Sequence, residues 1–370
     1  MSESHGPEGS DRPASLVLED GSEFSGRAFG AIHSCGGEVV FATGMVGYPE
    51  SLTDPSYRGQ ILLLTYPLVG NYGVPARHHV EAGELPAGFE SDRIQATALV
   101  ISKLSLEYSH WKATRSLASW LAEEGVVGLS GIDTRAVTKK LRDEGSMAGK
   151  ILVEGDTQVT ARSPFEDIHQ RNLVKEVSVR EPVLYGNGRT RVILVDCGAK
   201  ANIIRSLVAR GASVLRVPWD HDFNAEDASG VMVSNGPGNP KLATATVENL
   251  RVALSQDRPL FGICLGNQLV GLAAGCDTYK LKFGHRSQNQ PCQEVGTQRC
   301  FITSQNHGFA INGQTLPQEW QEWFVNTNDG TNEGIRHRQK PFRTVQFHPE
   351  ATPGPTDTSY LFDEFLELLR

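Results

Sequence analysis

The sequence predicts an α/β fold for the second half of the chain, with an open, mostly parallel sheet, and an α+β domain before it. Short apolar runs at residues 191–196 and 259–263 have the length and composition of buried strands. Between them, Val247, Leu250 and Leu254 follow helical spacing. Buried strands that alternate with amphipathic helices are typical of βαβ units, whose helices cover both faces of a parallel sheet.

The first elements along the chain indicate the α+β domain. Residues 14–22 end in an Asp-Gly turn, and residues 38–41 are β-branched and aromatic, so we expect strands joined by hairpins. Helices are predicted over residues 113–124, ended by Gly125, and over residues 134–143. This first part of the chain is therefore predicted to be α+β.

The α/β domain is predicted element by element in the same way. Its strands are expected at residues 191–196, 213–217, 230–233 and 259–263. A helical pattern that Gly211 closes follows the first strand, and a new helix follows the last one directly. Residues 361–369 have helical apolar spacing and predict a final helix that packs against the core.

Changes in composition mark the domain boundaries. Residues 1–13 are polar, lack the apolar segment of a secretory signal, and are expected to form a disordered leader. We predict the α+β domain over residues 14–153. Residues 154–190 gather prolines and glycines and are predicted to be a linker to the α/β domain at residues 191–370.

Composition argues against several classes of protein. The 43 acidic and 35 basic residues give a net charge of −8, which disfavours binding to nucleic acid or to an anionic membrane. No apolar run approaches the roughly 20 residues that cross a bilayer. The 6 cysteines lack C-x-x-C spacing and predict free thiols in a reducing compartment. We therefore expect a cytoplasmic protein, or one of the mitochondrial matrix if a transit peptide has been removed.

Cys264 has the surroundings of a nucleophile. Gly262 and Gly266 flank it at the predicted junction between a strand and a helix, where small neighbours permit a sharp turn that projects the side chain. A helix N-terminus also favours the thiolate over the thiol. A structural cysteine is the alternative for any cysteine taken at random, but the glycines and the junction favour a nucleophile.

A nucleophilic thiol needs a group that accepts and returns its proton. His348 follows the late apolar run 344–347, and Glu350 is close enough in sequence to orient its ring. An isolated histidine is more often an ordinary surface or core residue. The presence of Cys264 is what favours a catalytic role for His348. Residues 234–240 follow another predicted strand, and their glycines would let backbone N–H groups approach a developing oxyanion.

These motifs resemble the class I glutamine amidotransferases of the triad type, which places the predicted sheet in that family's fold. They are Gly-Ile-Cys-Leu-Gly-x-Gln at residues 262–268, Ser-Asn-Gly-Pro-Gly-x-Pro at residues 234–240 and His-Pro-Glu at residues 348–350. Further motifs are similar to the glutaminase small subunit, or fused glutaminase region, of carbamoyl phosphate synthetase. These lie at residues 37–41, 47–50, 53–57, 131–135, 305–309 and 332–335.

The resemblance implies a reaction and a partner. Cys264 would attack the carboxamide of glutamine, His348 would carry the proton that releases ammonia, and Glu350 would support His348. The glutamine-binding residues would be Ser56, Gly236, Gly238, Leu265, Gln268, Asn306, Gly308 and Phe309. The N-terminal domain would dock the large subunit or fused synthetase domain. The chain itself would need no cofactor or metal, because ATP, magnesium and bicarbonate would be used by that partner.

One position departs from the family's pattern. Asn267 stands where histidine is common; together with residues 219–223 and 356–362 it resembles the animal branch that serves urea synthesis and arginine metabolism. Members of that branch that use free ammonia have lost the cysteine, so Cys264 predicts glutamine hydrolysis. Asn267 also leaves open a non-catalytic regulatory or docking module with a vestigial site. An amidotransferase for anthranilate or guanylate synthesis would not explain residues 14–150.

Two other features are weaker signals. Residues 145–150 imitate a phosphate-binding loop, but the glycine spacing is one residue short and Ile151 replaces the Ser or Thr that would hold magnesium. No nucleotide site is therefore predicted. His78 and His79 lack nearby acidic or cysteine ligands and are expected to be an exposed loop pair.

Overall fold

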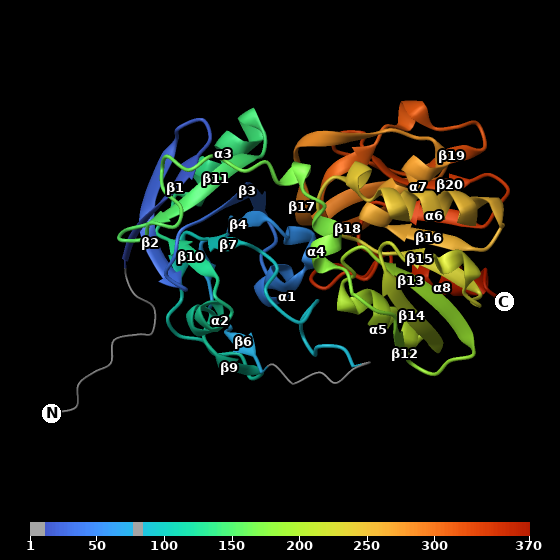
Figure 1. The fold of residues 1–370 in the computed structure, drawn as a ribbon, viewed down its shortest axis with the longest axis horizontal. Helices are drawn as coiled ribbons and strands as arrows, with labels where there is room; N and C mark the ends of the chain where they lie inside the picture. The colour runs from blue at the N-terminus through green and yellow to red at the C-terminus, as the bar shows by residue number, and fades with distance from the viewer. Residues whose placement is uncertain (1–11, 77–83) are drawn as a thin grey trace. The chain divides into compact units, whose positions relative to one another are not determined.

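A computed structural model describes residues 12–76 and 84–370 (Figure 1). The chain divides into two compact units, Met1–His79 with Ala87–Ile168, and Val80–Pro86 with His169–Arg370. Most of the predicted leader lies outside the described residues, as do His78 and His79. Strand β1 begins at Arg12, two residues before the predicted start of the first domain.

The first unit is built around a closed barrel. Its strands follow the order β1, β11, β3, β4, β7, β10 and β2. The pairs β3–β4, β4–β7 and β7–β10 are parallel and the others antiparallel. The barrel strands are β1 (Arg12–Leu18), β2 (Glu23–Gly30), β3 (Cys35–Ala42), β4 (Gln60–Leu64), β7 (Ala98–Val100), β10 (Val127–Ser130) and β11 (Met147–Val153). The strand-rich opening predicted from the sequence is confirmed, although its closure into a barrel was not predicted.

In the described part of the first unit, three α-helices accompany the barrel. They are α1 (Tyr48–Thr53), α2 (Leu117–Glu123) and α3 (Thr134–Glu144). Helix α3 confirms the prediction for residues 134–143, whereas only part of the predicted helix 113–124 forms. Ser116 caps α2 by accepting the Ser119 N–H, so the helix starts there. Residues Ala113–Arg115 instead form strand β9, which pairs with β6 (Val74–Pro75).

Small two-stranded and single-turn elements complete the first unit. They are β5 (Leu68–Val69), β8 (Lys103–Leu104) and the 3-10 helix η1 (Pro55–Tyr57). The segment that imitates a phosphate loop joins the end of α3 to β11. Within it, Lys150 is buried, and its ammonium donates to the carbonyls of Ala161 and Ser163.

The second unit is built on one ten-stranded sheet in the order β12, β14, β13, β15, β16, β21, β20, β19, β17 and β18. Strands β14, β13, β15, β16 and β21 are parallel neighbours, and the remaining pairs are antiparallel. The parallel strands are β13 (Thr190–Asp196), β14 (Ala212–Pro218), β15 (Gly230–Val233), β16 (Leu260–Ile263) and β21 (Phe342–Val345). The predicted α/β class is confirmed, and the parallel part contains every strand predicted there.

The antiparallel part of this sheet was not anticipated. It consists of β12 (Val183–Tyr185), β17 (Thr278–Glu294), β18 (Cys300–Ile311), β19 (Trp320–Asn326) and β20 (Asn332–His337). Strand β17 contains many polar residues and its pairing with β18 has two register shifts, so it lacks the regular alternation that reveals a strand in a sequence.

Helices cover both faces of the sheet (Figure 1). They are α5 (Ala201–Ala209), α6 (Thr244–Ser255), α7 (Leu265–Ala274) and α8 (Tyr360–Glu367). Val192 and Leu194 pack in a core with α5 and α8, whereas Ile193 and Val195 point the other way, into a core with α6 and α7. The final helix is core-facing as predicted, since Leu361, Phe362 and Phe365 are buried.

The segment predicted to be a linker contains short elements. They are η2 (Ile168–Gln170), α4 (Leu173–Val177) and β12, which pairs with β14 at the edge of the sheet. Three further single-turn helices lie in the second unit: η3 (Phe223–Ala225), η4 (Pro240–Leu242) and η5 (Gly313–Thr315). Among the described residues, none of the helices has both the length and the apolar character needed to cross a membrane.

Candidate active site

Cys264 stands at the junction of β16 and α7 in a backbone conformation that few residues other than glycine adopt. Its φ is 55° and its ψ is −104°. Strand β16 ends at Ile263 and α7 begins at Leu265, so Cys264 occupies the N-cap position. The sharp strand-to-helix turn predicted from the sequence is therefore confirmed. Backbone strain of this kind concentrates at functional sites.

The two neighbouring glycines are required by close packing. A Cβ on Gly262 would lie 2.7 Å from backbone atoms of Gly266, and a Cβ on Gly266 would lie 2.2 Å from the carbonyl oxygen of Val233. Val233 is the last residue of β15, the neighbouring strand. The spacing Gly-x-Cys-x-Gly thus lets the start of α7 press against β15, which fixes the position of the thiol.

The Cys264 thiol is buried, with 1% of the residue exposed, but its surroundings are not only apolar. Its Sγ donates to the carbonyl oxygen of Asn306 at 3.6 Å, and the side-chain N–H of Gln346 donates to Sγ at 3.6 Å. The Cys264 N–H donates to the carbonyl of Val345 at 2.8 Å. The sulfur therefore lies where α7, β18 and the end of β21 meet.

His348 lies beside this thiol, just beyond the end of β21. Its Nδ1 donates to Glu350 Oε1 at 2.6 Å, and its Nε2 has no protein hydrogen-bond partner in the described part of the chain. Burial opposes a charge on the ring, but the Glu350 carboxylate and the adjacent Cys264 thiol raise the pKa of His348 to about 10. The ring therefore holds a proton at neutral pH, next to the sulfur.

Lys200 supports Glu350, a role that the sequence analysis missed. Its ammonium lies 3.1 Å from Glu350 Oε1, and both side chains are almost fully buried. Burial alone would raise the pKa of Glu350, but the Lys200 and His348 charges lower it to about 2. Lys200 is the N-cap of α5, just after β13. A lysine at the carboxyl end of a parallel strand was the available signal.

Gln346 and Asn267 form a second group of hydrogen-bonded side chains next to the Cys264 thiol. Gln346 Oε1 accepts from Asn267 Nδ2 at 3.1 Å and from Gln268 Nε2 at 3.0 Å. Asn267 also accepts the hydroxyl of Thr344 at 2.6 Å. Thr344 lies on β21, and Gln346 and His348 follow at alternate positions just beyond the end of that strand. This spacing of two residues could have identified Gln346. The Asn267 amide thus orients the Gln346 amide, which contacts Cys264.

The predicted oxyanion loop follows β15 and packs against the end of β13. The Ser234 hydroxyl accepts the Cys197 N–H at 2.9 Å, and Asn235 accepts the Lys200 N–H at 3.0 Å. A Cβ on Gly236 would lie 2.0 Å from the Cys197 carbonyl oxygen, and Gly238 has a φ of 85°. Glycine is therefore required at Gly236 by packing and favoured at Gly238 by conformation.

Several predicted glutamine-binding residues gather around Cys264. Leu265 is the first residue of α7, where backbone N–H groups lack intrahelical partners. Gln268, one turn later, donates to the Phe309 carbonyl at 2.8 Å. Asn306, Gly308 and Phe309 lie together on β18. The structure thus brings together residues that are up to 44 positions apart, from Leu265 to Phe309.

Ser56 belongs to the first unit. It lies in η1 (Pro55–Tyr57), is buried, and its N–H donates to Asp54 Oδ1 at 2.9 Å. Its assignment to the glutamine site stays a prediction.

One group of side chains could hold a metal ion, although no metal was predicted. Ligand atoms of His285, His307 and Glu333 lie within 4.8 Å of one another, and all three residues are buried. His285 and Glu333 were not predicted as site residues, because they are separated along the chain and follow no ligand spacing.

Known protein families match both parts of the chain. Residues 193–368 match the family model of class-I glutamine amidotransferases, and residues 16–151 match the CPSase domain of the carbamoyl-phosphate synthase small chain. The chain is 53% identical over 360 residues to the multifunctional protein CAD of Squalus acanthias, covering 96% of this chain and 16% of that protein.

Two further relatives show the same pattern. Identity is 50% over 382 residues to the multifunctional protein pyr-3 of Neurospora crassa, covering 95% of this chain and 21% of the relative. The identity is 49% over 360 residues to the mitochondrial carbamoyl-phosphate synthase [ammonia] of Homo sapiens, covering 96% of this chain and 24% of that protein. The chain therefore spans about a quarter or less of these proteins, and the similar identities do not select the urea and arginine branch. Residues 16–151 of this chain belong to the carbamoyl-phosphate synthase small-chain family, and residues 193–368 belong to the class-I glutamine amidotransferases.

Proposed function

We propose that this chain hydrolyses glutamine to glutamate and ammonia, with Cys264 as nucleophile, His348 as proton carrier and Glu350 as the group that orients His348. One observation carries the proposal: a strained strand-to-helix junction presents the Cys264 thiol beside an imidazole whose other nitrogen is bound to a carboxylate. A nucleophile, a base and an orienting group in this order are the requirements of acyl transfer by cysteine.

The reaction follows from these contacts. The proton given up by the Cys264 sulfur is the one that the His348 ring holds at Nε2 at neutral pH. The ionised Sγ then forms a bond to the carboxamide carbon of glutamine. The backbone N–H groups of Gly238 and Leu265 would stabilise the oxyanion. When the tetrahedral intermediate collapses, the C–N bond breaks and His348 returns the proton to the leaving nitrogen, which departs as ammonia. Water activated by His348 then cleaves the glutamyl thioester, so that glutamate and the free thiol are formed.

Glutamine itself would be held by the residues around this junction. Gln268 can recognise the α-amino or the α-carboxylate group, because an amide both donates and accepts hydrogen bonds. Recognition of the other group by the Ser56 hydroxyl is a prediction from the sequence alone. Gly236, Asn306, Gly308 and Phe309 would complete the binding site. Each of these contacts is a prediction that a bound substrate analogue can test.

We further propose that the ammonia is delivered to a carbamoyl phosphate synthetase large subunit or fused synthetase domain. The match of residues 16–151 to the small-chain CPSase domain and the greater length of the relatives support this partner. ATP, magnesium and bicarbonate would act on that partner, and the present chain would supply no cofactor. The N-terminal unit would provide the docking surface.

Replacement of the nucleophile tests the proposal. Cys264→Ser in the full-length protein should abolish glutamate release from glutamine, while carbamoyl phosphate synthesis from added ammonia continues. Retained glutamine hydrolysis would contradict the role of Cys264. Cys300→Ser is a matched control, because Cys300 is exposed and lies on β18 away from the β16–α7 junction.

A second measurement separates an enzyme from a module with a vestigial site. Rapid acid quenching of the wild-type protein with glutamine, followed by peptide mass spectrometry, should detect a glutamyl adduct on the peptide that contains Cys264. A vestigial site would form no such adduct, and hydrolysis would then be attributed to another protein in the preparation.

A further inference from the structure

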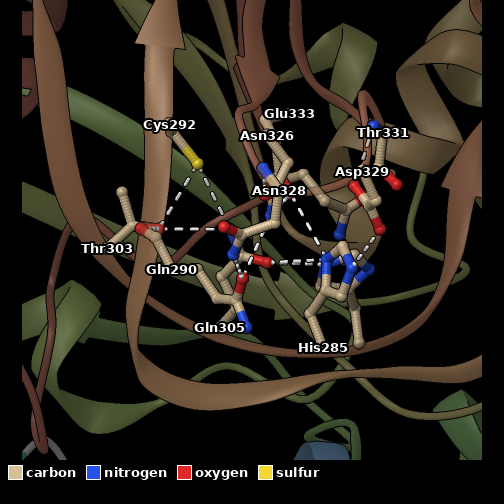
Figure 2. Close-up of polar contacts among 12 residues, drawn as sticks. His285, Gln290, Cys292, Thr303, Gln305, Asn326, Asn328, Asp329, Thr331 and Glu333 are labelled. Atoms are coloured by element: carbon tan, nitrogen blue, oxygen red, sulfur yellow. Dashed lines mark hydrogen bonds and ion pairs between the residues drawn. The ribbon is translucent and has the colours of Figure 1, made fainter.

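A second buried polar cluster lies next to the candidate active site, where β17 pairs with β18. We call it the His285 cluster; it comprises His285, Gln305, His307, Asp329 and Glu333. Figure 2 shows His285 surrounded by side chains from β17, β18, β19 and β20 and from the turn before β20. The proposed function uses none of these five side chains.

His285 is held by carboxylates from two directions. Its Nε2 lies 2.9 Å from Asp329 Oδ2, and its Nδ1 lies 3.4 Å from Glu333 Oε1. Glu333 is fully buried and is also bound by Asn326 Nδ2 at 3.1 Å. A buried carboxylate is costly unless it is paired, so the ring of His285 and Glu333 depend on each other.

The Nδ1 atom of His285 also contacts the β18 segment that carries the predicted glutamine-binding residues. Its Nδ1 lies 3.0 Å from Gln305 Oε1, and His307 Nε2 lies 3.0 Å from that same oxygen. The rings of His285 and His307 meet edge to face at 4.9 Å. Residues His285 and His307 are also direct partners in the strand register.

His307 continues the chain of contacts to the binding residues. Its Nδ1 lies 2.8 Å from the Phe309 carbonyl oxygen, which also accepts Gln268 Nε2 at 2.8 Å. Asn306, between Gln305 and His307, presents its carbonyl to the Cys264 thiol. A displacement of Gln305 and His307 would therefore move backbone groups that touch both Gln268 and Cys264.

The charges around the cluster favour a protonated His285 beside a neutral His307. Burial opposes the charge of His285, but Asp329 and Glu333 raise its pKa to about 9. Burial and the neighbouring charge of His285, with smaller contributions from Arg286 and His348, lower the pKa of His307. Because Gln305 Oε1 and the Phe309 carbonyl are both acceptors, a neutral His307 donates to only one of them at a time.

We propose that His285, which is paired with Asp329 and Glu333, is a positioning residue for glutamine binding. Through its contacts with Gln305 and His307 it holds residues 305–309 in place. The inference rests on the proposed function, because it assigns glutamine to that segment. His285 does not touch the substrate in this proposal. Its contribution is to hold the backbone and side-chain groups that do.

The test compares His285→Asn with the parent protein. In a full-length Cys264→Ala background, which cannot turn glutamine over, calorimetry gives the Kd of glutamine directly. At pH 7, His285→Asn should weaken binding about tenfold, the order expected when hydrogen bonds to a charged group are lost. With Cys264 present, KM should rise by a similar factor, while kcat changes by less than about twofold.

Measuring both Kd values over a range of pH shows whether His285 acts through its charge or only through the volume of its ring. The ratio of the two Kd values should fall from about tenfold at pH 7 towards one at pH 10, because the parent protein loses the His285 proton near pH 9. The ratio cancels the titration of glutamine's own amino group. His221→Asn is the matched control, since it removes another histidine–carboxylate pair, His221–Glu226, which is partly exposed.

A second variant keeps the test decisive if His285→Asn does not fold. Glu333→Gln preserves size and removes the charge, and it should weaken binding in the same direction by a smaller factor. Equal Kd values at pH 7, a ratio independent of pH, or a Cys264→Ala parent that binds no glutamine would each overturn the inference. Stoichiometric zinc in the purified parent, lost in His285→Asn, would also overturn it, because a metal would then join the two rings. Failure of the proposed function looks different: glutamine binds normally, but the protein with Cys264 releases no glutamate.

Discussion

Two buried histidines of the second unit are bound to carboxylates, but they differ in whether the second ring nitrogen also has a hydrogen-bond partner. His348 uses Nδ1 on Glu350 and has no protein hydrogen-bond partner at Nε2 within residues 84–370. His285 uses Nε2 on Asp329 and Nδ1 on Gln305. A ring with one nitrogen free can transfer a proton, whereas a ring with both nitrogens bound can only hold charge and geometry. A buried histidine paired with a carboxylate is therefore suited to proton transfer at His348 and to positioning at His285.

Replacement of His348 should reduce glutamine hydrolysis more than any other change to the two histidine sites. His348→Asn should lower kcat for glutamine hydrolysis by roughly a thousandfold, the scale of general acid–base catalysis, while KM changes little. His285→Asn should show the opposite split, with a change in KM rather than in kcat. Steady-state assays of glutamate release measure both parameters. The comparison fails if His348→Asn loses less than tenfold in kcat, or if His285→Asn loses as much kcat as His348→Asn.

The second effect concerns stability and distinguishes the buried ion pairs from surface pairs. Glu350→Gln leaves the buried ammonium of Lys200 without its counter-charge, so the free energy of unfolding should fall by about 3 kcal/mol in urea titrations. Glu226→Gln, which removes the carboxylate of the partly exposed His221 pair, should cost less than about 1 kcal/mol. The double variant Lys200→Met with Glu350→Gln should recover part of the loss. Equal costs for the two single glutamate variants would contradict a buried, coupled pair.

The third effect uses pH to compare the two rings. Both histidines have a raised pKa, about 9 for His285 and about 10 for His348, against an ordinary value of 6.5. Each pair therefore adds stability that is complete below pH 6.5 and is lost as pH rises through the folded-state pKa. Over that range each proton contributes a slope of about 1.4 kcal/mol per pH unit.

Unfolding measurements between pH 6 and pH 10.5 can separate these contributions. Relative to wild type, His285→Asn should flatten the decline in stability up to about pH 9, and His348→Asn should flatten it up to about pH 10. Identical profiles for the two variants would show that the carboxylates do not hold the two rings differently. The opposite sign, with wild type gaining stability as pH rises through this window, would contradict a raised pKa for either ring.

The difference between the two histidine sites also explains what could be predicted from the sequence. Cys264 was identifiable because its glycines stand two residues away on either side, and His348 and Glu350 are themselves neighbours. His285 and Glu333 meet only through the pairing of β17, β18, β19 and β20, which includes several register shifts. Periodicity locates a regular strand but does not give its register across an irregular antiparallel sheet.

The same reasoning covers the fold. The parallel strands β13 to β16 are mostly apolar and were predicted within one or two residues, because strands buried on both faces have that composition. The polar strand β17 was missed. Lys200 was also missed. Its position after β13 was a signal for the site, but its partner Glu350 is 150 positions away, so the sequence does not indicate which residue it pairs with.

A last substitution, at Cys292, should have little effect. It tests whether the position of Gln305 depends on the charged His285 ring or on the neighbouring Cys292 sulfur. Cys292 is fully buried beside this cluster, where its Sγ lies 3.4 Å from Thr303 Oγ1 and accepts Gln305 Nε2 at 3.3 Å. Burial raises the pKa of this thiol, so it carries no charge at neutral pH. In Cys292→Ser, a hydroxyl can replace both contacts; unfolding should cost about 1 kcal/mol less, and KM for glutamine should stay within about twofold of wild type. If KM instead rose as much as in His285→Asn, hydrogen bonding at Gln305 alone would position the segment, and the carboxylate-bound ring would lose its special role.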